Sequence, residues 1–477
     1  MLNHFRHMIA SEHPVKTIRD GLIGEGLTYA GRHGDVPLVY ADYVASGRAL
    51  CQVEDFIRDH VLPYYANPHT EASFCGAYVN KLREESRAEI GRLTKAEGCA
   101  VVFTGSGATA GLSRLPALLG VEEAENPVVL LGPYEHHSNL LPWRESKATV
   151  IEIPEGEAGG PDLLALEAAL KHHGGSDLLI GSFSVASNVT GILTDTDAVT
   201  RLIKAYGGVS IWDYAGGAPY LSIDMATGTD AEKDVVVAST HKFPGGPGGS
   251  GVMIIRHSVV RRKTPTQPGG GTVRFVSPWG HDYLEDLIAR EEAGTPDLLG
   301  DVRAALAFII KDTIGQAAID QRERALNALA QAGLSTVANL TILGAEHDHR
   351  LPIYSMLIRD ADGHVVNSEQ VTRDLSELYG IQARGGCACA GPYGHRLLHV
   401  DEAESAALRC QILAGHDDLK PGWVRLNFSY LMSDNTAQYI IDSVRELATA
   451  YAQKDGQFAK ATSPWAGLDA QGGHVGS

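Results

Sequence analysis

The sequence has few cysteines for its length and no run of basic residues. Six cysteines among 477 residues are too few for a disulfide framework, which favours a reducing compartment. The formal net charge of -18 gives the chain no general attraction to nucleic acid or to anionic lipid. No stretch is typical of a membrane span, and the first residues lack the apolar core of a signal peptide. We therefore expect a cytoplasmic protein without nucleic-acid or membrane partners.

The composition is that of an ordinary globular protein. Hydrophobic residues make up 44% of the chain and charged residues 21%. A chain of this length buries a large core, so its stability requires neither a structural metal nor disulfides. We predict no metal site, because no complete set of Cys and His ligands has the spacing of one.

Seven short runs rich in Val, Ile and Leu predict strands in the first part of the chain. They do not alternate strictly between apolar and polar residues, which is typical of strands buried on both faces. Helical patterns lie between several of them, and this alternation predicts an α/β fold with a mostly parallel, helix-covered sheet. The predicted strands are 100–104, 128–132, 149–153, 178–184, 209–213, 235–238 and 251–256, and the helices are 107–119, 161–173 and 196–206.

The pattern changes after Pro296. Two long helical stretches lead into a smaller α+β segment that ends in a further helix, and Gly, Ala and Ser dominate the last residues. The predicted helices here are 300–313, 314–332, 369–379 and 436–453, and the strands are 354–358 and 424–427. We predict an N-terminal arm (1–30), a large domain (31–300), a small C-terminal domain (301–455) and a flexible tail (456–477).

Lys242 follows a predicted buried strand and precedes a loop rich in Gly and Pro. Partial burial lowers the pKa of a lysine and leaves its amine neutral for reaction with a carbonyl. Asp213 ends another predicted strand, and a carboxylate there suits the protonated nitrogen of a pyridine ring. A single lysine at a strand end is more often a plain surface residue, so the interpretation depends on the other residues at neighbouring strand ends.

Three more strand ends carry polar groups. The turn from Phe103 to Thr109 runs from a strand into a helix, and such turns offer backbone N–H groups to a phosphate. A pair of histidines that includes His136 follows the second strand, and an imidazole can stack on an aromatic ring. Asn188 follows the fourth strand and can form hydrogen bonds with ring substituents. Because ligand sites of open α/β sheets gather at strand carboxyl ends, these groups indicate a pyridoxal 5'-phosphate (PLP) site.

Motifs over most of the chain resemble those of a known family. In order, they are ADYVASGR, ANPHTEAS, FTGSGATAG, EHHSNLLPW, SVASNVTG, WDYAGG, STHKFPGGPGG, PGGGT, REEAGTPD, RGGCACAGP and VRLNFSY. The chain resembles the class V aminotransferase group of fold-type I PLP enzymes, specifically the cysteine desulfurase and selenocysteine lyase branch. Each motif is short, but their number and order make the resemblance specific. It implies the fold-type I PLP-dependent transferase fold and PLP as cofactor.

The resemblance implies the residues that bind the cofactor. Lys242 is the Schiff-base lysine and the acid–base group at the substrate α-carbon. Asp213 pairs with the pyridine nitrogen, and His136 is a catalytic residue that stacks on the ring. The residues implied at the phosphate of the same subunit are Ala108, Thr109, Ser239 and His241.

Other implied roles concern the substrate and a second subunit. Asn188 lies near the ring oxygen or the substrate carboxylate, and Arg425 pairs with the substrate α-carboxylate through its planar, bidentate fork. Thr272, in PGGGT, reaches the phosphate of the partner subunit, so we expect a homodimer. The sequence departs from the family at Gly216, where a Gln that contacts the phenolic oxygen of PLP is common.

A loop with two cysteines carries the remaining chemistry. In the desulfurase branch the catalytic cysteine lies five residues after the arginine of this loop, which is Cys389 after Arg384 here. Its thiolate attacks the sulfur of cysteine bound to PLP, and Arg384 favours the thiolate. Cys387 is an alternative nucleophile or a resolving partner. The alternatives to these roles are that the cysteines are plain buried residues, or half of a metal site for which no second half is found.

The predicted function is therefore that of a cysteine desulfurase or selenocysteine lyase. The substrate is a small amino acid, the product is alanine, and a persulfide on Cys389 passes to a possible acceptor protein. A class V aminotransferase or a carbon–sulfur lyase remains the alternative, since either uses Lys242, Asp213 and Arg425 without a thiol. A sulfur-transfer scaffold that binds PLP without turnover is a further alternative.

Overall fold

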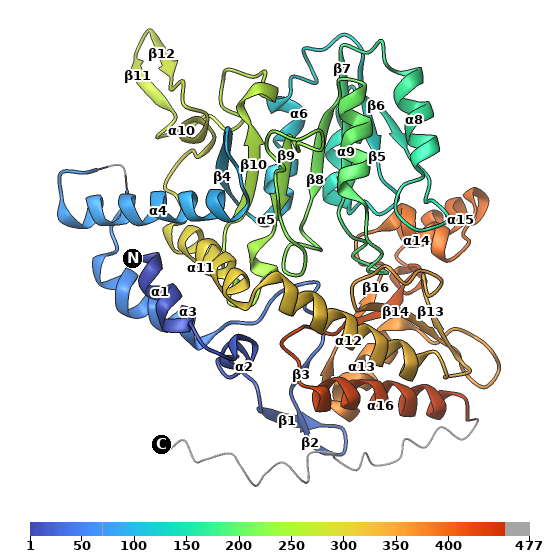
Figure 1. Ribbon diagram of the computed structural model, residues 1–477. Coiled ribbons are helices and arrows are strands. Elements are labelled where there is room, and N and C mark those ends of the chain that lie inside the picture. The colour runs from blue at the N-terminus through green and yellow to red at the C-terminus, as the bar shows by residue number, and fades with distance from the viewer. Residues whose placement is uncertain (69, 454–477) are drawn as a thin grey trace.

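The computed structural model describes residues 1–68 and 70–453 (Figure 1). The predicted tail, 456–477, lies outside the described residues. Within the part of the chain that is described, no helix is both long enough and apolar enough to cross a membrane. Two sheets dominate the structure, and a long N-terminal segment packs against elements of both (Figure 1).

The larger sheet has seven strands in the order β4-β10-β9-β8-β7-β5-β6. The strands from β9 to β6 pair in parallel, and β10 is antiparallel to both of its neighbours. The predicted mostly parallel sheet is therefore confirmed. The strands are β4 (Cys99–Gly105), β5 (Pro127–Leu131), β6 (Thr149–Glu152), β7 (Leu178–Ser184), β8 (Val209–Asp213), β9 (Val235–Ala238) and β10 (Gly251–Arg256), each within one residue of its prediction.

Both faces of this sheet are buried, which explains the continuous apolar runs. Along β4, Val101 and Phe103 belong to one apolar core, whereas Ala100 and Val102 belong to another on the opposite face. Helices α8 (Leu163–His172) and α9 (Thr196–Ala205) contribute to the first core, and α5 (Gly107–Leu112) and α6 (Leu115–Leu118) to the second. Short helices α7 (Leu141–Arg144) and α10 (Leu287–Glu291) contribute to the second core as well.

The prediction of one continuous helix over 107–119 is wrong. The structure has two short helices there, α5 and α6, with Ser113 and Arg114 between them. Pro116 has no backbone N–H, so it cannot bond to the carbonyl of Leu112 as a continuous helix requires. The proline instead occupies the first turn of α6, where a missing N–H costs nothing.

The second sheet has four antiparallel strands in the order β13-β14-β17-β16. Helices α12, α13 and α16 pack around it and share its apolar core. The predicted elements of this part agree with the structure within two residues. Strands are β13 (Leu340–Ile342), β14 (Ile353–Ile358), β16 (Arg384–Gly386) and β17 (Trp423–Asn427); helices are α12 (Gln316–Leu334), α13 (Ser368–Tyr379), α14 (Gly391–Leu397), α15 (Glu402–Leu413) and α16 (Asp434–Tyr451).

A long helix, α11 (Leu298–Ile314), precedes the elements of the smaller sheet. It packs against α4 (Phe74–Leu93), and its apolar side chains belong to the core of the larger sheet. Gly315, with φ of +84°, separates α11 from α12, one residue later than predicted. The predicted domain boundary near residue 300 falls at the start of α11 and stays a prediction.

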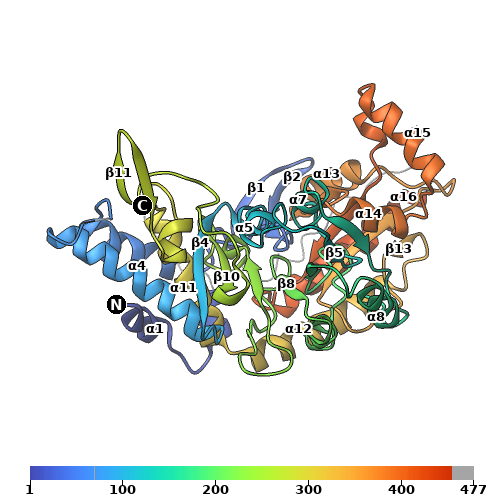
Figure 2. The same ribbon diagram turned by 90° about the horizontal axis from the view of Figure 1, so that it is seen from above.

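The N-terminal segment packs against helices from the apolar cores of both sheets. Helix α1 (Leu2–Ile9) packs on α11, and α2 (Pro14–Arg19) and α3 (Cys51–Phe56) both contact α1. The hairpin of β1 (Thr28–Gly31) and β2 (Gly34–Pro37) contacts α13, and β3 (Val39–Tyr40) pairs in parallel with β15 (Ile381–Gln382). A second hairpin, β11 (Val273–Ser277) with β12 (Gly280–Tyr283), projects at the opposite end of the molecule from α15 (Figure 2).

Candidate active site

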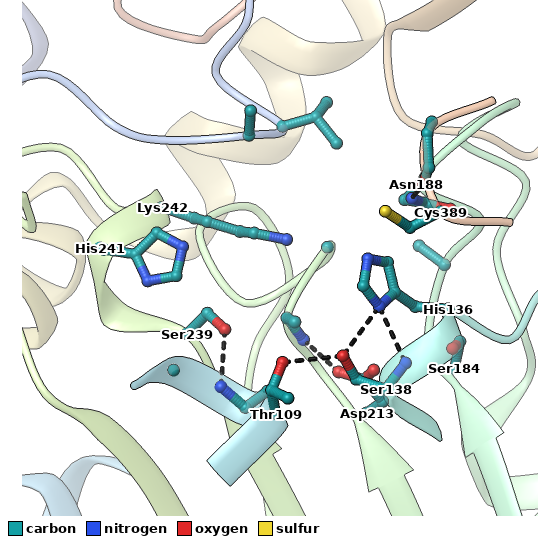
Figure 3. Close-up of a pocket in the computed structure, with 18 of the residues that line it drawn as sticks. Thr109, His136, Ser138, Ser184, Asn188, Asp213, Ser239, His241, Lys242 and Cys389 are labelled. Atoms are coloured by element: carbon teal, nitrogen blue, oxygen red, sulfur yellow. Dashed lines mark hydrogen bonds between the residues drawn. The ribbon is translucent and has the colours of Figure 1, made fainter. Parts of the chain in front are cut away.

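A cavity of about 290 Å³ lies between the carboxyl ends of the seven-stranded sheet and the loop that precedes α14. It brings together residues from five strand ends of the larger sheet and Cys389 from the loop after β16 (Figure 3). All but one of the site residues predicted from the sequence line it. These are Ala108, Thr109, His136, Asn188, Asp213, Ser239, His241, Lys242, Cys389 and Arg425.

Lys242 ends a short 3₁₀ turn, Thr240–Lys242, directly after β9. The turn is anchored because the Thr240 hydroxyl donates to the Ser250 carbonyl at 2.6 Å. Burial lowers the pKa of the Lys242 amine to about 8, although Asp213 acts in the opposite direction. Near neutral pH a sizeable fraction of this amine is therefore neutral and able to react with an aldehyde.

Asp213 is the last residue of β8 and is buried. Burial raises its pKa, and its Oδ1 accepts a hydrogen bond from the Ala215 N–H at 2.7 Å. A second buried carboxyl, Glu135, accepts hydrogen bonds from the backbone N–H and the hydroxyl of Ser184 at 2.8 and 2.7 Å. Burial raises the pKa of Glu135 to about 8. Sequence reasoning missed Glu135, although it directly precedes the histidine pair.

His136 lines the cavity, with its ring on the same side as Ser138 (Figure 3). Its Nδ1 accepts a hydrogen bond from the Ser138 backbone N–H at 3.1 Å, so the neutral ring carries its proton on Nε2. Burial lowers the pKa of His136 to about 4, with Lys242 as the next cause. The Ser138 hydroxyl lies 2.7 Å from the Thr109 hydroxyl, and sequence reasoning did not single out this serine.

The turn into α5 packs closely against the residues before Lys242. The Ala108 N–H donates to the Ser239 hydroxyl at 2.9 Å. A β-carbon on Gly107, whose φ is +62°, would lie 3.0 Å from the Ser239 hydroxyl and 3.1 Å from the His241 ring. Only glycine fits this position without displacing its neighbours. Hydroxyl and imidazole groups line this end of the cavity, and their binding of a phosphate stays a prediction.

Arg425, on β17, is 4% exposed and lines the cavity. Its Nη1 donates to the Asn188 carbonyl and its Nη2 to Asp42 Oδ1, each at 3.0 Å. Asp42 Oδ2 accepts from Arg384 Nε at 2.9 Å, so one carboxylate joins two arginines. The Nε of Arg425 is buried and has no hydrogen-bond partner among the described residues. Sequence reasoning missed Asp42 because it lies 383 residues from Arg425.

Asn188 and Cys389 meet on the side of the cavity opposite the larger sheet. The Asn188 Nδ2 donates to the Ala388 carbonyl at 2.8 Å, which leaves its Oδ1 directed elsewhere. That Oδ1 is buried and unpartnered within the described part of the chain. Cys389 is exposed, and its sulfur points into the space between Asn188 and Lys242 (Figure 3).

Of three other residues that the sequence singled out, two lie outside the cavity and one lines it. Thr272 lies outside the cavity, buried, with its hydroxyl donating to the Gly269 carbonyl at 2.7 Å. Cys387 is half-buried and does not line the cavity. Gly216 does line it, and a β-carbon there would meet other atoms only at 3.8 Å. Over residues 1–68 and 70–453, no three His, Cys, Asp or Glu side chains are grouped to hold a metal ion.

The donor set fits a phosphorylated pyridine aldehyde such as PLP. An amine with a lowered pKa lies beside a buried carboxylate, and both follow neighbouring strands. Hydroxyl groups gather at one end, and two buried polar atoms, Asn188 Oδ1 and Arg425 Nε, have no partner among the described residues at the other. Buried polar atoms are rarely left unpaired, so these two atoms have hydrogen-bonding capacity that a polar ligand next to them would use.

Comparisons with known proteins agree with this fit. A family model described as aminotransferase class-V matches residues 39–414. A probable cysteine desulfurase of Staphylococcus epidermidis is 26% identical over 360 residues, which span 74% of this chain and 84% of that protein. A probable cysteine desulfurase of Pyrococcus abyssi is 28% identical over 373 residues, which span 76% of this chain and 88% of that protein.

Solved structures share the fold. The apo cysteine desulfurase of Thermococcus onnurineus NA1 has a TM-score of 0.72 at 23% identity, covering 86% of this chain and 95% of that one. The cysteine desulfurase CsdA of Escherichia coli has a TM-score of 0.67 at 20% identity, covering 85% and 93%. With the family match over most of its length, the chain belongs to the class-V aminotransferase family and is a PLP-dependent enzyme of the α/β fold predicted from its sequence.

Proposed function

We propose that this protein is a cysteine desulfurase, which converts L-cysteine to alanine and leaves the sulfur as a persulfide on Cys389. The observation that carries the proposal is the position of two groups in one cavity. The Lys242 amine and the Cys389 thiol line it together, and the sulfur points into the space between them (Figure 3). Relatives named probable cysteine desulfurases, at 26% and 28% identity, add support.

In this proposal the cofactor is held mainly by residues at strand ends of the larger sheet. Lys242 would hold PLP through its amine, Asp213 would pair with the pyridine nitrogen, and His136 would stack on the ring. Thr109, Ser239, His241 and the Ala108 backbone bind the phosphate. When bound, PLP supplies an electron sink for the electrons of the substrate Cα–H bond. Asp213 suits its part because its buried carboxylate keeps a positive charge on the ring nitrogen.

The substrate carboxylate is assigned to Arg425. Its buried Nε is unpartnered among the described residues and supplies a donor, while Asp42 fixes the orientation of the guanidinium. Asn188 presents a hydrogen-bond acceptor, because its Nδ2 is engaged by the Ala388 carbonyl. A protonated group of the ligand therefore fits Asn188 better than a carboxylate does. Lys242 removes the proton from the substrate α-carbon and later returns a proton to the product.

Sulfur transfer is assigned to Cys389. Its thiolate forms a bond to the sulfur of cysteine as the Cβ–S bond breaks, and the electron pair of that bond stays on Cβ. Protonation of Cβ completes alanine, so cysteine and the enzyme thiol give alanine and an enzyme persulfide, with atoms and charge balanced. Arg384 lines the same cavity as this thiol, and its positive charge is paired with Asp42. Selenocysteine is the related substrate in which selenium replaces sulfur.

The proposal extends to the enzyme's surroundings. All six cysteines are free thiols, which suits a reducing compartment such as the cytoplasm. An acceptor protein takes the persulfide sulfur from the exposed Cys389. We also propose a homodimer in which Thr272 contributes to the site of the partner subunit, and light scattering on the purified protein tests that state.

The test supplies PLP-loaded enzyme with L-cysteine and dithiothreitol and measures alanine, pyruvate and sulfide by mass spectrometry. The proposal requires equal amounts of alanine and sulfide. Cys389→Ser should lower sulfide release by about a hundredfold or more, because no other thiol lines the cavity within the described chain. Cys387→Ser is the matched control and should keep most of the activity, since Cys387 lies two residues away and outside the cavity.

Other outcomes identify the alternatives. Pyruvate in place of alanine indicates a carbon–sulfur lyase, and a requirement for a keto acid indicates an aminotransferase. Undiminished sulfide from Cys389→Ser removes the persulfide step. If amino acids change the absorbance of the cofactor but none of them is turned over, the protein is a sulfur-transfer scaffold that binds PLP.

A further inference from the structure

The Cys389 loop, which we define as residues 387–391, has a backbone that its own sequence disfavours. Ala388 and Cys389 have φ angles of +52° and +56°. This left-handed region brings a β-carbon close to a carbonyl oxygen, and residues other than glycine rarely enter it. Two such residues in succession persist only when contacts from outside the loop hold them.

Three hydrogen bonds from distant parts of the chain supply those contacts. The Asn188 Nδ2 donates to the Ala388 carbonyl at 2.8 Å. The His137 backbone N–H donates to the Cys389 carbonyl at 2.9 Å, and the Gly391 N–H donates to His137 Nε2 at 3.1 Å. His137 is therefore bonded to the loop twice, once at the residue that carries the thiol and once two residues later.

The two consecutive histidines have different partners. His136 lines the cavity, whereas His137 lies outside its lining and contacts the Cys389 loop. The His137 ring accepts the bond from Gly391 only while Nε2 carries no proton. Burial lowers the pKa of His137, with a smaller contribution from Arg144, and so favours this neutral form.

We propose that His137 is a positioning residue for sulfur transfer. It holds the Cys389 loop in the left-handed conformation that turns the sulfur toward Lys242, and it contacts neither substrate nor cofactor. The inference rests on the proposed function, because it gives His137 a part in the step in which Cys389 accepts sulfur. Removal of the side chain should impair that step and leave the chemistry at the substrate α-carbon intact.

Three substitutions of His137 separate the side-chain bond from the presence of a ring. His137→Gln places an amide oxygen near the position of Nε2, where it accepts the Gly391 N–H. His137→Asn ends near the position of Nδ1 and falls short of that N–H, and His137→Ala removes the acceptor. The backbone bond from residue 137 to the Cys389 carbonyl is available in all three.

Each PLP-loaded variant is measured in three ways. The first is sulfide release from L-cysteine with dithiothreitol. The second is exchange of the L-alanine α-hydrogen for deuterium in D₂O, which needs Lys242 and no thiol. The third is the rate at which iodoacetamide alkylates Cys389, followed by peptide mass spectrometry, with the exposed Cys51 on α3 as internal reference. Melting temperature and cofactor absorbance confirm that each variant is folded and loaded.

We expect kcat for desulfuration to fall about tenfold or more in His137→Ala and His137→Asn, with KM little changed, because the thiol is misplaced. His137→Gln should stay within about threefold of wild type because it restores the acceptor. Deuterium exchange should stay within about twofold in all three, since the groups at the α-carbon are untouched. Alkylation of Cys389 should rise about threefold or more in His137→Ala and not in His137→Gln, as the released loop opens more often.

Two results overturn the inference. One is unchanged alkylation of Cys389 in both His137→Ala and His137→Asn. The other is a parallel loss of desulfuration and deuterium exchange, which indicates a defect of the whole site. If wild type makes no alanine from cysteine, the proposed function fails by itself, and the alkylation rates still decide whether His137 holds the loop. If His137→Ala does not fold, the comparison of His137→Gln with His137→Asn decides it.

Discussion

The two sides of the cavity are built in different ways. Asp213 ends β8 and Lys242 follows β9, at one edge of a sheet whose two faces are buried. Cys389 instead lies in an exposed loop between β16 and α14, with a left-handed backbone and a few hydrogen bonds to distant residues. The core of the protein thus fixes the positions of Asp213 and Lys242, which we call the cofactor side. The position of Cys389, the thiol side, depends on hydrogen bonds from individual residues.

This difference matches the demands of the proposed reaction. Proton transfer at the substrate α-carbon needs an amine and a carboxylate at fixed distances, which buried strands provide. A persulfide has to reach an acceptor outside the cavity, which a strand end inside the core does not allow. We therefore expect substitutions on the cofactor side to abolish every reaction, and those on the thiol side to abolish desulfuration alone.

The largest expected effect is that of Lys242→Ala. Without its amine, both desulfuration and α-deuterium exchange should fall by about a thousandfold or more, because one group holds the cofactor and transfers the proton. Both rates are measured on the same preparation. If the variant loses desulfuration but keeps deuterium exchange, the assignment of Lys242 to the cofactor side is contradicted, since Lys242 would then act only in the thiol step.

Lys311 provides an internal control for this lysine. It is also buried, and burial lowers its pKa to about 7, but its Nζ donates to the Ala218 carbonyl at 2.7 Å and it does not line the cavity. Borohydride reduction of the PLP-loaded protein should therefore mark the peptide of Lys242 and not that of Lys311. If a lowered pKa alone decided which lysine reacts with PLP, both peptides would be labelled. Mass spectrometry of the two peptides therefore shows whether the position of the lysine in the cavity is also required.

Arg425→Lys should have the second largest effect. A lysine at this position cannot keep the bonds to Asp42 and to the Asn188 carbonyl while also binding a carboxylate, because it lacks the planar fork. We expect KM for cysteine to rise about tenfold or more, with a smaller fall in kcat. Deuterium exchange of alanine should show the same rise in KM, because both reactions begin with the same carboxylate contact. A rise for cysteine alone would place Arg425 on the thiol side.

Much of the cofactor side could be predicted from the sequence, whereas little of the thiol side could. Asp213 and Lys242 directly follow continuous apolar runs, so local pattern places both at strand ends and sheet topology then brings them together. Asp42 and His137 act through partners 383 and 254 residues away, and no local pattern encodes those pairs. The left-handed angles at Ala388 and Cys389 were equally hidden, because non-glycine residues give no signal for them.

The pH dependence of cofactor capture tests the burial of the cofactor side directly. A lysine captures an aldehyde as the neutral amine, and burial lowers the pKa of Lys242 to about 8. The neutral fraction should then rise about tenfold between roughly pH 7 and pH 9 and level off above, whereas an ordinary lysine would rise about a hundredfold without levelling. Stopped-flow absorbance after mixing PLP with cofactor-free protein measures this. A rate still rising steeply above about pH 9.5 contradicts the burial.

The smallest expected effect is that of Gly216→Gln, which restores a residue common in the family. The position lines the cavity on the cofactor side, and a β-carbon there meets the Ala186 carbonyl and the Asn188 β-carbon only at 3.8 Å, so a β-carbon causes no clash. A new hydrogen bond to the ring oxygen of PLP should shift the cofactor absorbance and change turnover by about threefold or less. Gly216→Ala is the control that adds bulk without a donor. Because the change lies wholly on the cofactor side, it should alter deuterium exchange and desulfuration by the same factor. Unequal factors would mean that the two sides of the cavity are coupled through the PLP ring.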